Sequence, residues 1–140
     1  MNARAWETIK LDVRQEMQEF IGFLILHLNK INTNGKFSEA IKSFSNLLDQ
    51  NLNELKNSKS YKEIDILQDE IYKNLDDLFL NIFPDSLERD HALVDISYVL
   101  KVNNMFQAST VASLIPEENF MVLFLNLVVS GSIDKAIDVA

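Results

Sequence analysis

Residues 60–84, SYKEIDILQDEIYKNLDDLFLNIFP, carry an apolar side chain at nearly every third or fourth position. This spacing places those side chains on one face of an α-helix. Ser60 and Glu63 stand three residues apart at the start, the spacing of a capping box, in which two side chains satisfy each other's backbone N–H groups. Pro84 ends the helix. Its predicted buried stripe consists of Tyr61, Ile64, Leu67, Ile71, Leu75, Leu78 and Ile82.

Helical spacing continues on both sides of this stretch. Upstream it predicts one helix from Trp6 to about Ile31, ended by Asn34 and Gly35, and a second over residues 37–55. Downstream it predicts helices over residues 85–102, 105–115 and 116–129 and a short last one from Ser132. The chain has only three glycines and two prolines, and no segment alternates like a strand. We therefore expect an all-α protein of six or seven helices, forming a single domain over residues 1–140.

Two of the expected helices are apolar on nearly all sides. They are the second half of the first helix and the run Phe120–Val129. A helix of this kind is normally enclosed, so we expect the first and sixth helices to pack together in the core. The alternative is that part of residues 120–129 forms an interface with a partner or with another copy of the chain.

Composition excludes several classes of protein. The 140 residues include no cysteine, which excludes disulfides, thiolate zinc sites and cysteine nucleophiles. The first ten residues lack the apolar core of a signal peptide. The longest apolar runs fall short of the roughly 18–20 residues that span a bilayer. We expect a cytoplasmic protein that does not enter membranes.

The net charge is concentrated in an acidic segment from Glu63 to Asp95. Ten carboxylates face only Lys73 and Arg89 there, so this segment holds the whole net charge of −8 and the rest of the chain is neutral. Such a field attracts cations and basic proteins and repels nucleic acid and anionic membranes. The residues that we expect to bind a partner are Asp65, Asp69, Glu70, Asp76, Asp77, Glu88 and Asp90.

This charge pattern predicts a non-enzymatic protein that binds and masks a basic partner protein. Its most concrete form is an immunity protein that inhibits a cationic nuclease toxin, with carboxylates occupying the place of phosphates. One alternative is a helical scaffold or secretion-chaperone-like adaptor that grips a peptide in an apolar groove. Another is a nucleic-acid mimic that occupies a DNA-binding protein.

Motifs for catalysis and metal binding are incomplete. Glu88 and His91 have the Glu-x-x-His spacing of carboxylate-bridged di-iron bundles. A second copy is missing, because Leu24 stands three residues before the other histidine, His27. No glycine-rich phosphate loop or nucleophile elbow is present. We therefore predict no enzyme activity, no cofactor and no metal.

Three turns share a local pattern of Asn or Gly, a hydrophobic residue and then alanine. The alanines are Ala40, Ala108 and Ala136, and the first two are 68 residues apart. Residues 35–44, GKFSEAIKSF, resemble the start of the second helix of a tetratricopeptide repeat, whose period is 34 residues. The resemblance implies helical hairpins and a concave surface for a peptide. It carries over no binding residue.

Overall fold

The computed structural model describes residues 3–139, and all of its regular structure is helical. It contains seven α-helices and two short 3₁₀-helices, and no strand occurs in this range. The predicted all-α class and the number of helices are confirmed. The helices form two compact units, an N-terminal unit that ends at Ile82 and a C-terminal unit that begins at Phe83. A single domain over residues 1–140 stays a prediction.

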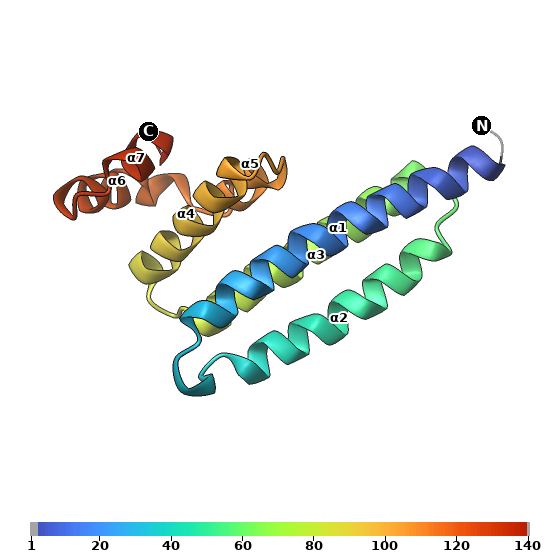
Figure 1. The fold of residues 1–140 in the computed structure, drawn as a ribbon, viewed down its shortest axis with the longest axis horizontal. Coiled ribbons are helices and arrows are strands. Elements are labelled where there is room, and N and C mark those ends of the chain that lie inside the picture. The colour runs from blue at the N-terminus through green and yellow to red at the C-terminus, as the bar shows by residue number, and fades with distance from the viewer. Residues whose placement is uncertain (1–2, 140) are drawn as a thin grey trace. The chain divides into compact units, whose positions relative to one another are not determined.

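The N-terminal unit consists of three long helices. They are α1 (Ala3–Ile31), α2 (Ser38–Lys56) and α3 (Tyr61–Ile82), with the 3₁₀-helix η1 (Thr33–Gly35) between the first two. Figure 1 shows that α2 runs opposite to α1 and to α3. The chain reverses after α1 at Asn34 and Gly35, which both have positive φ angles. The predicted end of the first helix is therefore confirmed, with Asn34 sharing the left-handed turn.

The core of the N-terminal unit comes from one face of each helix. On α3 every predicted stripe residue except Tyr61 is buried, and Phe79 joins them. Phe20 of α1 lies against Tyr72 of α3, with ring centroids 6.1 Å apart, and Trp6 meets Tyr61 edge to face at 5.3 Å. The buried apolar residues of α1 include Met17, Phe20, Ile21, Leu24 and Leu28, and those of α2 include Ile41, Phe44, Leu48, Leu52 and Leu55.

Side chains cap the first turns of two helices, and α3 begins at the capping box that the sequence predicts. At α3 the Ser60 hydroxyl accepts from the backbone N–H of Glu63 at 3.2 Å, and the Glu63 carboxylate accepts from the backbone N–H of Lys59. At the next helix the Asp85 carboxylate accepts from the backbone N–H of Glu88 at 3.0 Å. The bonds to Ser60 and Asp85 satisfy N–H groups that the first turn of a helix leaves free. The bond to Glu63 comes from Lys59, one residue before the Ser60 N–H that the predicted capping box would use.

The C-terminal unit is built around α4 (Ser86–Val102). This helix contacts α5 (Gln107–Ala112), α6 (Phe120–Val129) and α7 (Ile133–Val139), and η2 (Glu117–Asn119) precedes α6. Because α4 has neighbours on several sides, its buried residues cover much of its circumference: Asp90, Ala92, Leu93, Val94, Ile96 and Leu100. One of its charged residues, Asp90, therefore meets protein rather than water.

Three details of the predicted architecture are wrong. The first and sixth helices do not share a core within a unit, because α1 belongs to the N-terminal unit and α6 to the C-terminal unit. Helix α6 is not enclosed: only Leu123 and Leu127 are buried, and Val129 is 86% exposed. The fifth helix is shorter than residues 105–115, because Asn104 adopts a left-handed turn and α5 begins at Gln107.

Candidate partner-binding surface

The α3 acidic stripe consists of Asp65, Asp69, Glu70, Asp76 and Asp77. Successive residues of an α-helix are rotated by about 100°, so these five positions fall within one side of α3, opposite its buried stripe. Four of them are exposed and Asp76 is half-buried. The structure therefore brings together five of the seven residues predicted to bind a partner.

The carboxylates of the α3 acidic stripe have no ionic partner within the described part of the chain. The ion pairs found over residues 3–139 all involve other carboxylates. Lys73 is exposed on the same side of α3, one turn from Asp69 and from Asp77. One lysine cannot neutralise five carboxylates, so the stripe keeps a strong negative field at the surface.

Two apolar side chains are exposed on the same side of α3. Ile66 is 56% exposed and Leu80 is 46% exposed, and their helical positions fall between those of the acidic residues. An isolated exposed apolar residue is common on a protein surface. Here they add apolar contact area to a charged face.

Glu88 and Asp90 do not join the α3 acidic stripe, because both lie on α4 in the C-terminal unit. Glu88 is exposed in the first turn of α4, where a carboxylate interacts favourably with the positive end of the helix. The stability of α4 is therefore sufficient to explain a carboxylate at position 88.

Asp90, one of the residues expected to bind a partner, is buried, so it does not offer its carboxylate to a partner at the surface. Asp90 is only 1% exposed, and its Oδ2 accepts a hydrogen bond from Nδ2 of Asn119 at 3.0 Å. Burial raises the pKa of the Asp90 carboxyl, while the Asn119 hydrogen bond and the charges of Arg89 and His91 lower it. The sequence offered no signal for this arrangement, since Asn119 is 29 residues away.

Other polar residues of α4 are also engaged within the C-terminal unit. Nε2 of His91 lies 2.7 Å from Oδ1 of Asn126 on α6, and Asp95 pairs with Lys135 of α7 at 2.5 Å. His91 therefore positions a helix in this structure. Over residues 3–139 no group of three or more histidine, aspartate or glutamate side chains is arranged to hold a metal ion.

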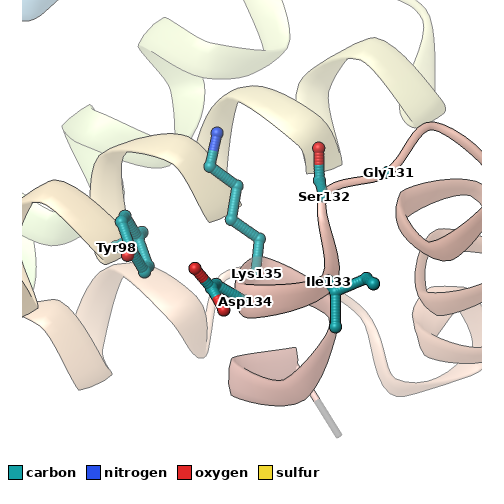
Figure 2. Close-up of a pocket in the computed structure, with 6 residues that line it drawn as sticks. All are labelled: Tyr98, Gly131, Ser132, Ile133, Asp134 and Lys135. Carbon is teal, nitrogen blue, oxygen red and sulfur yellow. The ribbon is translucent and has the colours of Figure 1, made fainter.

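Two surface hollows lie among the described residues of the C-terminal unit. The first, about 470 Å³, lies between Tyr98 of α4 and residues 131–135, as Figure 2 shows. Its cation, Lys135, is already paired with Asp95. The residues around this hollow therefore offer no free cation for a ligand.

The second hollow, about 620 Å³, lies between α4, α5 and Asp138 of α7. Met105, Ala108 and Ala112 contribute apolar surface to it, and Phe106 at its edge is 63% exposed. Sequence reasoning missed this groove, because it arises from the short α5 and the turn that precedes it.

The chain matches no protein-family model, and comparisons with curated proteins and with solved structures find no match. The tetratricopeptide resemblance of residues 35–44 stays a local one. No helix within residues 3–139 combines the length and the hydropathy needed to cross a bilayer. Function must therefore be argued from the surfaces described above.

Proposed function

We propose that this protein is a non-enzymatic binding protein that masks a basic partner protein through the α3 acidic stripe. The observation that supports the proposal is the set of five carboxylates on one side of α3, without ionic partners among the described residues. Opposite charge accelerates the encounter and selects the sign of the partner. Ile66 and Leu80 supply apolar contacts once the two surfaces meet.

The concrete form of this proposal is an immunity protein for a cationic nuclease toxin, acting in the cytoplasm. The stripe would then occupy the basic surface on which the toxin holds phosphates. A nucleic-acid mimic would use the same carboxylates against a DNA-binding protein. Both forms predict association that weakens steeply as salt rises, because exposed charges are screened within about 10 Å at 0.1 M salt.

Charge reversal tests this proposal. The variant Asp65→Lys/Asp69→Lys/Asp76→Lys reverses three carboxylates on one side of α3. Its matched control, Glu39→Lys/Asp49→Lys/Glu54→Lys, makes the same charge change at exposed positions of α2. The wild-type protein is used to capture basic proteins from a lysate of the source organism at low salt, and each identified protein is then titrated with both variants.

The proposal expects the α3 variant to lose binding while its circular dichroism stays unchanged, and the α2 variant to keep most of its affinity. Equal affinity of both variants would reject the stripe as the binding surface. A partner that high salt does not release would also contradict an electrostatic mechanism.

A second candidate function is an adaptor that binds a peptide in an apolar groove. The hollow edged by Phe106 favours it, because its size lies in the range of ligand-binding clefts. Phe106→Ala separates the two candidates: it weakens an adaptor's peptide complex, but it leaves a complex on the α3 acidic stripe intact.

A further inference from the structure

Two neighbouring titratable residues of α4 hold the η2–α6 segment. Oδ2 of Asp90 accepts from Asn119 at the end of η2, and His91 bonds Asn126 on α6. The two asparagines are seven residues apart, about two helical turns. The docking of this segment on α4 therefore depends on hydrogen bonds made by two adjacent side chains of α4, one of which is a carboxyl group that can bind a proton.

The second oxygen of Asp90 is buried without a partner. Oδ1 has no hydrogen-bond donor among the described residues, although Asp90 is almost completely inaccessible to solvent. A buried carboxylate that is neither paired nor fully hydrogen-bonded is costly in its charged form. Burial accordingly raises the pKa of Asp90 above its ordinary value of 3.8.

No neighbouring element supplies a cation that pairs with Asp90 in the described chain. Arg89 donates to the backbone carbonyl of Phe83 at 3.2 Å, and α5 and α6 contain no charged residue. The charged residues on η2 and α7 are either exposed or paired with other residues of α4: Glu117, Glu118 and Asp134 are exposed, Lys135 pairs with Asp95, and Asp138 pairs with Lys101.

We propose that Asp90 is a proton-operated latch: a proton on Oδ1 tightens the docking of η2 and α6 on α4, and its release loosens it. The neutral carboxyl costs less to bury, and Oδ2 still accepts from Asn119. Since α6 carries exposed apolar side chains, among them Met121, Leu125 and Val129, the latch controls how firmly that surface is held.

The sign of the pH dependence is unusual for a carboxyl group. Above the folded-state pKa Asp90 is charged, and the docking of η2 and α6 on α4 is then at its weakest. Between that pKa and the ordinary value of 3.8 the folded state binds more protons than the unfolded state, so this group makes the C-terminal unit more stable as the pH falls. Carboxylates that are paired in the folded state act in the opposite direction.

Amide hydrogen exchange over residues 119–129, corrected for intrinsic rates, tests the latch from pH 8 down to pH 4, close to the ordinary pKa of an aspartate. Asp90→Asn keeps an acceptor for Asn119 and cannot ionise. We expect this variant to exchange severalfold more slowly than wild type at pH 8, and the difference to shrink as the pH falls. A difference that does not change with pH, or faster exchange at pH 8, would overturn the proposal.

Two further variants complete the test. Asp95→Asn makes the same charge change on α4 at a half-exposed ion pair, so it is expected to leave no pH-dependent difference over residues 119–129. Asn119→Ala removes the hydrogen bond that lowers the pKa of Asp90. Carbon-13 NMR is expected to show the Asp90 carboxyl titrating at higher pH in this variant, and an unchanged or lower midpoint contradicts the latch even if Asp90→Asn does not fold.

Discussion

Helices α3 and α4 follow each other in the chain and share the acidic segment, yet they use their carboxylates differently. On α3 the stripe residues face solvent without ionic partners among the described residues. On α4, Asp85 caps the helix, Asp90 is buried against Asn119, and Asp95 pairs with Lys135. The difference follows from the surroundings of each helix. One side of α3 is left to water, whereas α4 has neighbours on several sides, so its polar residues become structural.

The largest expected effect on stability distinguishes two adjacent residues of α3. Phe79 is fully buried and Leu80 lies on the side of the acidic stripe. Phe79→Ala is expected to lower the free energy of unfolding by about 3–5 kcal/mol, because it removes contacts and leaves a cavity. Leu80→Ala is expected to change it by less than about 0.5 kcal/mol. Urea denaturation measures both, and a large loss for Leu80→Ala would mean that this side of α3 is covered in solution.

Local signals explain why the sequence predicted so much of the helical structure. The capping residues Ser60 and Asp85 act within their own first turn, and the stripe of α3 depends only on helical period. The same reasoning recovered the five residues of the α3 acidic stripe, because opposite faces of one amphipathic helix are related by spacing alone.

Residues that depend on distant partners were not predictable in this way. The burial of Asp90 requires Asn119 from η2, and the role of His91 requires Asn126 from α6. The exposure of α6 was missed for a related reason. A helix that is apolar on all sides is predicted to be buried, but its composition does not determine how many other helices pack against it.

Helix caps give the next largest effect, and here α3 and α4 should behave alike. Ser60→Ala and Asp85→Ala each remove the side-chain acceptor of a first-turn N–H group. Each is expected to lower the free energy of unfolding by about 1 kcal/mol. The controls Ser60→Thr and Asp85→Asn keep an acceptor and should recover most of the loss. A cap variant without effect would mean that the helix does not begin at that residue in solution.

The ion pair between Asp95 and Lys135 tests whether charged residues of α4 are structural. Both side chains are partly exposed, so a double-mutant cycle with Asp95→Asn and Lys135→Met is expected to give a coupling of about 0.2–1 kcal/mol. The coupling should fall in 1 M salt, because the pair is screened. No coupling at low salt would mean that Asp95 does not stabilise the fold, and that in this respect it does not differ from the carboxylates of α3.

The smallest expected effect has the opposite sign and lies on α3. Asp65 and Asp69 are one turn apart, and like charges at this spacing destabilise a helix by about 0.2–0.5 kcal/mol. Asp65→Asn should therefore stabilise the protein slightly at low salt, and the gain should disappear at high salt. Thermal unfolding at two salt concentrations measures it. A loss of stability would show that Asp65 has a structural partner, as the carboxylates of α4 do. A gain in stability together with weaker binding of a basic partner would show that the carboxylate is present for recognition, because folding alone does not favour it.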